Sequence, residues 1–238
     1  VGTNALLANT TGPNNTAVGS SALAANTTGD TNTAVGYLSM DANTTGTNNV
    51  AVGDNTLGAN TTAANNTAVG SQALAANTTG TENVAVGALA GDAITTGNHN
   101  TAIGYISLSA ATTANDNTAV GREALRDTTT GHSNTAVGKE AMKLNTTGHS
   151  NTTMGINAGQ SITTASNNLL LGKDAGVTGS PGGNITTSSN NIVLGDENIG
   201  NLYCTQTSIS TSDRRDKNSI TNFTGGLSWI NAMNPVTY

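Results

Sequence analysis

The chain has few of the residues from which a globular core is built. Aromatic residues make up 3% of its 238 residues and charged residues 9%, with one Phe, one Trp and one Cys. The single cysteine, Cys204, excludes an intrachain disulfide. This scarcity of large side chains argues against an ordinary globule and favours thin layers stabilised by their neighbours.

Positive charge and long apolar runs are also scarce. The first Lys or Arg is Arg122, so the leading half carries only acidic charges, and the net charge is -6. We therefore expect no binding to nucleic acid. No run of about 18 apolar residues occurs, so we expect no membrane insertion. The chain begins at Val1 without a Met or a signal peptide, which predicts a fragment or a processed chain.

What the sequence does contain is a 17-residue repeat. Thr16-Ala17-Val18-Gly19 opens a unit, and similar openings follow at Thr33, Val50, Thr67, Val84, Thr101, Thr118, Thr135, Thr152 and Leu169. The unit from Leu169 is longer, because it contains the insertion at residues 179–183 and ends at Asn191, and Ile192 opens an incomplete unit. A fixed period predicts an all-β fold, a parallel β-solenoid or β-roll of 17-residue coils over residues 1–200.

The unit at residues 67–83 shows the expected local structure. Thr-Ala-Val predicts a short strand that ends at Gly70, and Asn-Thr-Thr at residues 77–79 predicts a second strand. Gly80 and Asn83 suit the tight turns at the corners of a coil. The Ala-Leu segment between the two strands suits either a third strand or one helical turn.

Stacked coils predict columns of identical residues. With a rise of roughly 4.8 Å per coil, ten coils give a rod of roughly 50 Å. Val18 and its equivalents form one apolar column, and Ala17 and its equivalents face the other side of the strand. Because a thin coil buries only one face inside itself, the second face predicts association between chains. We expect an intertwined or side-by-side homotrimer with the alanine column at its axis.

Two groups of polar residues recur at equivalent positions. Arg122 stands over Lys139, Glu123 over Glu140 and Arg126 over Lys143, which we interpret as a solvated face with diagonal pairing. His132 and His149 also share a position. A metal site is the weaker alternative for them, because no carboxylate or cysteine completes it, and exposed turn residues are favoured. We expect no cofactor.

Two further features are open to more than one interpretation. The insertion at residues 179–183 predicts a surface loop, either a tolerated bulge or a binding loop. N-glycosylation sequons occur at the Asn-Thr-Thr triplets and at Asn14, Asn65, Asn151, Asn184 and Asn222. They are expected to be bare in a bacterial or phage product, whereas a eukaryotic source would make the chain a glycan-coated fibril.

The repeat resembles those of known fibrous proteins. Its NTAVG, AL and NTTG segments, over roughly residues 1–200, are similar to the head repeats of trimeric autotransporter adhesins and to repeats ahead of phage tail-fibre chaperone modules. The adhesin repeats are commonly shorter than this one. The resemblance implies a homotrimeric fibre that is located on a virion or at a cell surface.

The end of the chain carries a second, more specific resemblance. Ser212-Asp213-Arg214-Arg215-Asp216-Lys217, followed by a stretch that closes on Pro235-Val236-Thr237-Tyr238, is similar to the start of the self-cleaving intramolecular chaperone domain of phage tailspikes and tail fibres. This implies that Ser212 is a nucleophile, that Lys217 is its base and that cleavage falls between Ser212 and Asp213. The base role needs a lysine pKa lowered by burial or by cationic neighbours.

The resemblance also divides the chain. Residues 201–212 become a connector to the cleavage junction, and residues 213–238 become the truncated start of the chaperone domain, because the chain ends at Tyr238 where the family has a whole domain. Self-cleavage by this chain therefore stays open.

Three functions follow from these features. The first is a structural and adhesive phage tail fibre that binds a host-surface glycan or protein. The second is a cell-surface adhesin or extracellular filament. The third is an enzyme, either the self-cleaving peptidase or a glycan-degrading tailspike. Glycan degradation is the least favoured, because no pair of carboxylates recurs in a position suited to acid/base catalysis.

Overall fold

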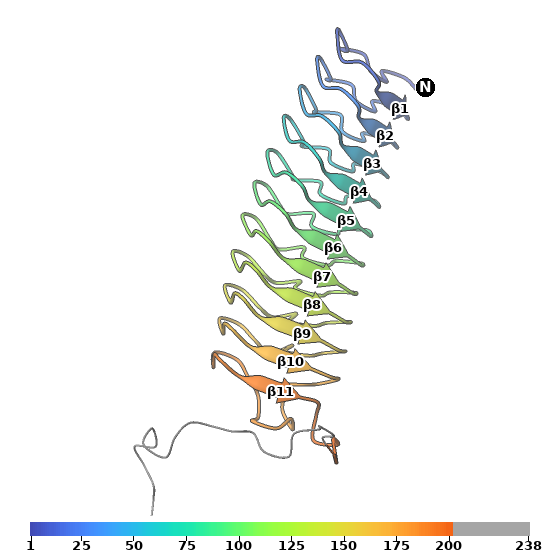
Figure 1. The fold of residues 1–238 in the computed structure, drawn as a ribbon. Helices are drawn as coiled ribbons and strands as arrows, with labels where there is room; N and C mark the ends of the chain where they lie inside the picture. Colours follow the sequence, from blue (N-terminus) through green and yellow to red (C-terminus); the bar gives the residue numbers. More distant parts are fainter. Residues whose placement is uncertain (202–238) are drawn as a thin grey trace, which may run out of the picture. The chain divides into compact units, whose positions relative to one another are not determined.

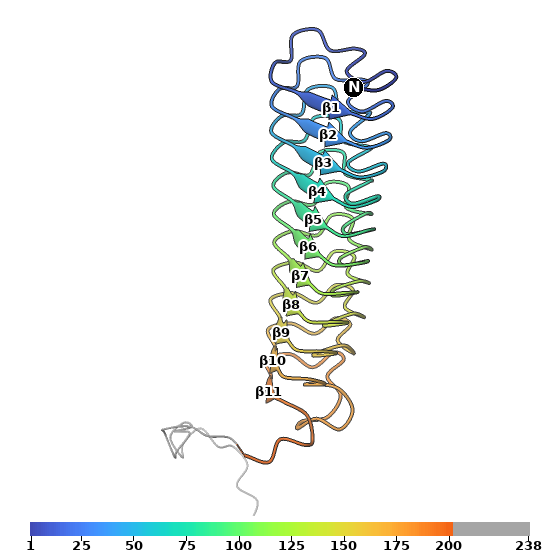
Figure 2. The ribbon, with the colours of Figure 1, turned by 90° about the vertical axis from the view of Figure 1, so that its right-hand side faces the viewer.

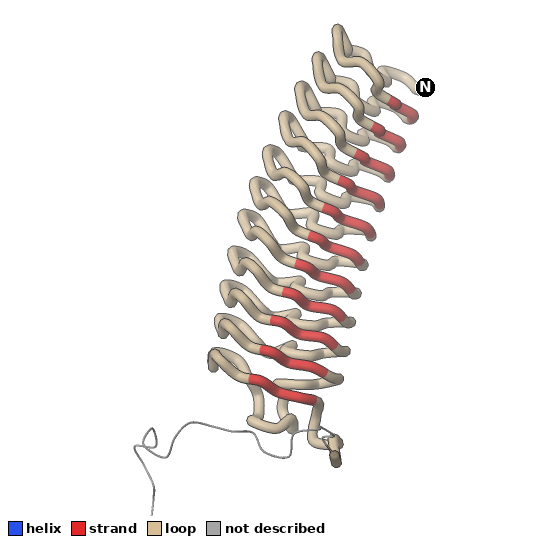
Figure 3. Tube along the Cα trace, in the orientation of Figure 1, coloured by secondary structure: helices blue, strands red, loops and turns tan. Residues whose placement is uncertain are grey.

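A computed structural model describes residues 1–201, in which Val1–Ile199 forms one compact unit. This unit is a rod of stacked coils, and each strand comes from the same place in its repeat (Figures 1 and 3). The strands are β1 (Thr16–Val18), β2 (Thr33–Val35), β3 (Val50–Val52), β4 (Thr67–Val69), β5 (Val84–Val86), β6 (Thr101–Ile103), β7 (Thr118–Val120), β8 (Thr135–Val137), β9 (Thr152–Met154), β10 (Leu169–Leu171) and β11 (Ile192–Leu194).

The strands form one parallel sheet in sequence order, β1 to β11 (Figure 2). Thr16, Ala17 and Val18 pair with Thr33, Ala34 and Val35, so each residue stands beside its equivalent in the next coil. The same register holds at every step, including the lengthened one from Leu169 to Ile192. The predicted all-β, parallel solenoid with 17-residue coils is therefore confirmed.

The predicted second strand at Asn-Thr-Thr is wrong. The N–H groups of Thr27 and Thr28 both donate to the carbonyl oxygen of Thr44, at 2.9 and 3.2 Å. The Thr27 hydroxyl donates to the same oxygen at 3.0 Å. The Gly29 N–H donates to it as well, at 3.3 Å. Four donors that converge on one acceptor do not make the evenly spaced ladder of a parallel pair, although threonine favours strands. The segment is a hydrogen-bonded corner.

The Ala-Leu segment is neither a strand nor a helical turn. Ser21 and Leu23 both adopt the left-handed conformation, with φ of 57° and 52°. This conformation is costly for residues other than glycine, and it persists only where the surroundings enforce it. Here it turns the chain through a compact corner and places the Leu23 side chain inside the coil, fully buried.

The two faces of the strands are reversed relative to our expectation. Ala34, in the middle of β2, is fully buried inside the coil, whereas Val18 is 43% exposed and Ile103 38% exposed. The alanine column is therefore not at the axis of an assembly, and that prediction is wrong. The reason is volume, because beneath β1 to β8 the buried Leu23 and most of its equivalents fill the coil and leave room for only a methyl group, whereas beneath β10 the larger Leu170 is buried where glycine replaces the leucine.

An unbroken asparagine ladder closes every coil. It consists of Asn15, Asn32, Asn49, Asn66, Asn83, Asn100, Asn117, Asn134, Asn151, Asn168 and Asn191. In each step the side-chain oxygen of one asparagine accepts from the backbone N–H of the next, as between Asn32 and Asn49 at 3.0 Å. The Asn32 amide also donates to the Gly46 carbonyl at 2.8 Å. These buried amides have their hydrogen bonds satisfied by neighbouring coils.

A second asparagine column is interrupted. It contains Asn9, Asn26, Asn43, Asn60 and Asn77, and it resumes at Asn145. From Asn26 to Asn77 each amide donates to the oxygen of the previous asparagine, as from Asn43 to Asn26 at 2.8 Å, whereas Asn145 donates to the Thr128 hydroxyl at 3.3 Å. Isoleucine takes this position in the coils after Asn77 and Asn145, so the oxygens of both residues lack a partner among the described residues.

The interruption spans Ile94, Ala111 and Thr128, and it begins with a paired exchange inside the coil. Where Ile94 replaces the asparagine, Gly91 replaces the buried leucine three residues earlier. A side chain at Gly91 would meet Ile94 at 3.0 Å and Leu74 at 3.2 Å. Gly159 with Ile162 and Gly176 with Ile185 repeat the exchange. At Gly91 the isoleucine fills the volume that the leucine fills elsewhere, whereas at Gly176 the nearest side chain is Leu170, at 2.8 Å.

Candidate functional site

The outward face of the sheet is built from two columns of side chains. The first column contains Thr16, Thr33, Val50, Thr67, Val84, Thr101, Thr118, Thr135, Thr152, Leu169 and Ile192. The third column contains Val18, Val35, Val52, Val69, Val86, Ile103, Val120, Val137, Met154, Leu171 and Leu194. None of these residues is charged, and most are β-branched, so the face is neutral and largely apolar along the rod.

This face changes character at the last three strands. Over β1 to β8 the first column holds Thr or Val, and the third holds Val with one Ile. Over β9 to β11 larger side chains appear, and Met154 is 52% exposed, Ile192 72% and Leu194 39%. The most apolar part of the outward face therefore lies at its C-terminal end.

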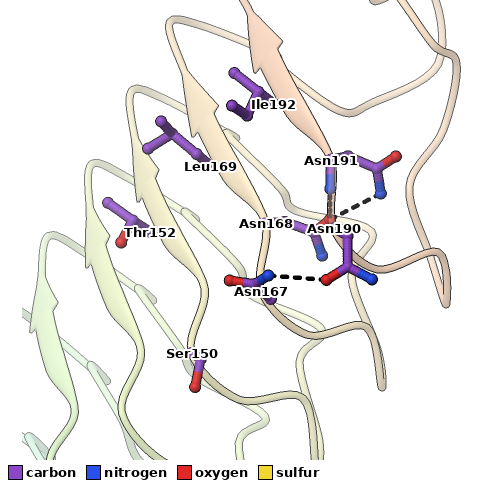
Figure 4. Close-up of a pocket in the computed structure, with 8 residues that line it drawn as sticks. All are labelled: Ser150, Thr152, Asn167, Asn168, Leu169, Asn190, Asn191 and Ile192. Carbon is purple, nitrogen blue, oxygen red and sulfur yellow. Dashed lines mark hydrogen bonds between the residues drawn. The ribbon is translucent and has the colours of Figure 1, made fainter. Parts of the chain in front are cut away.

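A pocket of about 400 Å³ lies beside the first column at this end (Figure 4). Its lining is Ser150, Thr152, Asn167, Asn168, Leu169, Asn190, Asn191 and Ile192. Leu169 and Ile192 project from neighbouring strands on one side, and the asparagines come from the corners that precede those strands (Figure 4). The pocket therefore combines an aliphatic wall with an amide wall.

Hydrogen bonds fix the amide wall. Asn167 donates to the Asn190 oxygen at 2.8 Å, and the Asn191 side chain donates to the Asn168 oxygen at 2.8 Å. All of the lining side chains are neutral, so they suit binding rather than general acid–base chemistry at neutral pH. The site was not predicted, because its lining extends in sequence from Ser150 to Ile192 and depends on the stacking of three coils.

The charged group on the coils of β7 and β8 is paired across coils. The Lys143 ammonium lies 2.6 Å from the Glu123 carboxylate, and Arg126 lies 3.1 Å from it. Hydrogen bonds from Lys143 and then Arg122 lower the Glu123 pKa to about 2. The Glu123 side chain is only 9% exposed. The predicted diagonal pairing is present, but the description of Glu123 as part of a solvated face is wrong.

His132 and His149 lie next to each other as predicted, and both are exposed. Their rings are stacked with centroids 4.9 Å apart and an interplanar angle of 2°. Ring nitrogens direct their lone pairs within the ring plane, so stacked rings do not point at a common ion between them. Within residues 1–201, no group of three or more His, Cys, Asp or Glu side chains is placed to hold a metal ion.

A third histidine was not singled out from the sequence. His99 lies 3.5 Å from Glu82 in the coil before it and 3.2 Å from Asp116 in the coil after it. The repeat could have indicated this group, because Glu82, His99 and Asp116 are each separated by 17 positions and therefore stand at equivalent places in adjacent coils. All three side chains are more than half exposed, so the contacts add little stability.

The structure separates the sequons into two groups. The sequon asparagines Asn26, Asn43, Asn60, Asn77 and Asn145 are fully buried, as is Asn151. Their amides are used inside the coils, so they are not accessible to a glycosyltransferase in the folded chain. Asn14, Asn65 and Asn184 are exposed.

The residues predicted for self-cleavage, Ser212 and Lys217, lie outside the described residues, as do Cys204 and Asn222. Their roles stay predictions.

The geometry defines a class: a parallel β-solenoid with a neutral outward face. No protein-family model, curated protein or solved structure matches the chain. In the part of the chain that the structure describes, no helix has the length and apolarity of a membrane span.

Proposed function

We propose that the chain is the shaft of a structural and adhesive fibre, a phage tail fibre that acts as a homotrimer and attaches to a host-surface glycan or protein. The observation that supports this most is the outward face of the 11-stranded sheet. Purely parallel sheets are almost always covered on both faces, and here only the alanine side is covered by the chain itself.

The coverage that the face lacks is best supplied by copies of the same chain. Another copy presents the same neutral columns at the same rise per coil, so equivalent threonine and valine side chains meet along the whole rod. A uniform row without charge places no charged group in the interface. Three copies give a shaft whose polar corners and charged groups face outward.

Light scattering of the whole chain under native conditions tests the assembly. We expect a mass of three times 23.6 kDa. A mass of one chain over the whole range of working concentrations rejects the homotrimer and, with it, the fibre. Attachment is tested separately, with the fluorescently labelled chain on an array of bacterial surface polysaccharides, and binding to none of them and to no bacterial cell argues against an adhesive role.

Assembly and release belong to the same proposal. Residues 213–238 would begin a chaperone domain that drives trimer formation, and Ser212 and Lys217 would cut the chain before Asp213. Mass spectrometry of the product with its complete C-terminal region, beside Ser212→Ala and Lys217→Ala, tests this. If the unchanged chain stays whole and neither substitution matters, the processing step is rejected.

A cell-surface adhesin or glycosylated extracellular filament is the second candidate. The exposed sequons at Asn14, Asn65 and Asn184 favour it, because glycans there would not disturb the coils. Mass spectrometry of the protein from its native source distinguishes the two: glycans on these three asparagines support the filament, and bare asparagines support the phage fibre.

A further inference from the structure

The C-terminal end of the outward face carries two changes at the same height on the rod. The third column enlarges from Val or Ile to Met154, Leu171 and Leu194 in β9, β10 and β11. The pocket beside the first column is lined by residues of the same three strands, Thr152, Leu169 and Ile192. Larger projections and a hollow thus occur together, on opposite edges of one face.

Symmetry relates these two edges in a ring of parallel copies. When identical rods associate around an axis along their length, the third-column edge of one copy faces the first-column edge of the next at equal height. Such a heterologous contact closes into a ring, and the large third-column side chains then face the pocket of the neighbouring copy. Over β1 to β8 both edges carry smaller residues, which suit a flatter contact.

We propose that Leu171 of one copy, flanked by Met154 and Leu194, inserts into the pocket of the adjacent copy and fixes the axial register of the assembly. The inference rests on the proposed homotrimer and names the contact within it. Leu169 and Ile192 supply an aliphatic wall for the inserted side chain (Figure 4).

A second copy fits this pocket better than a charged or strongly polar ligand does. The lining has no charged side chain to pair with an ion. Two of its asparagine amides already donate within the wall, Asn167 to the Asn190 oxygen and Asn191 to the Asn168 oxygen. The exposed aliphatic area at Ile192 favours an apolar group, and the chain itself presents three such groups at the required height.

The axial alignment of neighbouring copies also needs a contact that occurs at one height only. The 17-residue repeat makes β1 to β8 nearly identical, so a shift of two rods by one coil would restore most contacts between them. A pocket and a projection that occur only at β9 to β11 remove this ambiguity, because only the unshifted arrangement brings them together.

The test replaces the projections by the residue that most other coils carry. The variant M154V/L171V/L194V in the whole chain is compared with Leu144→Val, whose exposed side chain lies outside the two columns. Sedimentation equilibrium should show trimer dissociation at a concentration at least about tenfold higher for the triple variant, because about one methylene is lost at each inserted position. The control should match the unchanged chain.

Cysteine cross-linking locates the contact. In a C204S background, Thr152→Cys with Leu171→Cys places thiols on opposite edges of the face, roughly 8 Å apart within a chain, which is too far for an intrachain disulfide. Oxidation should give a covalent trimer. The control, Thr130→Cys with Thr164→Cys, lies two coils apart on another exposed column, roughly 10 Å and so also too far for an intrachain disulfide, and should give none.

The outcomes separate the two proposals. A trimer that survives the triple substitution unchanged and forms no cross-link overturns the insertion and leaves the homotrimer standing. A chain that is monomeric before any substitution overturns both.

Discussion

The asparagine ladder and the second asparagine column differ in how many partners hold each residue. In the ladder, Asn100 donates to Asn83 and to the Ala114 carbonyl and accepts two hydrogen bonds from Asn117. In the second column, Asn43 donates to Asn26 and to the Gly46 carbonyl and accepts from Asn60 alone. The first position never changes along the chain, whereas the second accepts isoleucine. A position in this repeat is therefore more constant in residue type where its side chain makes more hydrogen bonds to neighbouring coils.

Asn100→Ala, in the asparagine ladder, is the substitution from which we expect the largest effect. It removes hydrogen bonds to two coils and leaves the Asn117 N–H buried without its partner. We expect a loss of about 3–5 kcal/mol in the free energy of unfolding, measured by urea denaturation at matched chain concentration. Thr96→Ala, at an exposed corner, is the control and should change it by less than about 0.5 kcal/mol. Equal effects from both variants would contradict the bonding explanation.

The paired exchange of Gly91 and Ile94 tests the second asparagine column, where a side chain can change if its partner changes with it. Gly91→Leu crowds Ile94, and Ile94→Asn leaves the volume beside Gly91 empty, so each single variant should be destabilised. The double variant restores the leucine–asparagine pair of the preceding coil, Leu74 with Asn77, and gives the Asn77 oxygen a donor. A double-mutant cycle should show a favourable coupling of about 2 kcal/mol. Additive single effects would show that the two positions do not share one volume.

Glu123 tests a contact between coils that depends on charge. Since its pKa in the folded chain is lowered to about 2, its contribution is complete above about pH 4.5 and is lost as the pH falls toward 2. Glu123→Gln should therefore cost about 1–2 kcal/mol at pH 7 and almost nothing at pH 2. Asp30→Asn, in a coil without Lys or Arg, is the control. A difference that persists unchanged at pH 2 would exclude the ion pair as the cause.

The smallest effect is expected at the one hydroxyl in the buried alanine column. Thr153 is fully buried in β9, and its oxygen has no hydrogen-bond partner among the described residues. Thr153→Val keeps the shape and removes the polar atom, so the chain should gain about 1 kcal/mol in thermal or urea unfolding. Val137→Thr, on the half-exposed outer column, should change little. A destabilised Thr153→Val would indicate that the hydroxyl has an unseen partner.

The repeat predicted the period, the register and the position of the strands, because the 17-residue spacing places each Thr-Ala-Val beside the next whatever the rest of the coil does. It did not predict which face of the strand is inside. Alanine and valine are both apolar, and the choice depends on the volume left by Leu23 and its equivalents. The second strand predicted at Asn-Thr-Thr was wrong because β propensity does not reveal that the N–H groups of Thr27 and Thr28 share one acceptor.

The candidate site was harder to predict from the sequence than the fold was. The neutral columns are visible as Thr-x-Val, and they led to the expectation of association between chains. The pocket brings together residues from Ser150 to Ile192 on three stacked coils, and no local pattern of residues marks them as one site. The candidate catalytic residues Ser212 and Lys217 follow from resemblance alone and belong to the chain beyond residue 201.

The two oxygens without partners among the described residues, on Asn77 and Asn145, show where the second asparagine column stops bonding one coil to the next. In a solenoid each coil is held only by its neighbours, so strength varies from one junction to the next. Side-chain hydrogen bonds of this column join the coils from Asn9 to Asn77, and beyond them, among the described residues, only Asn145 makes such a bond, to Thr128. Under tension along its axis, the coils that contain Asn9 to Asn77 should therefore stay together longer than the coils that follow them.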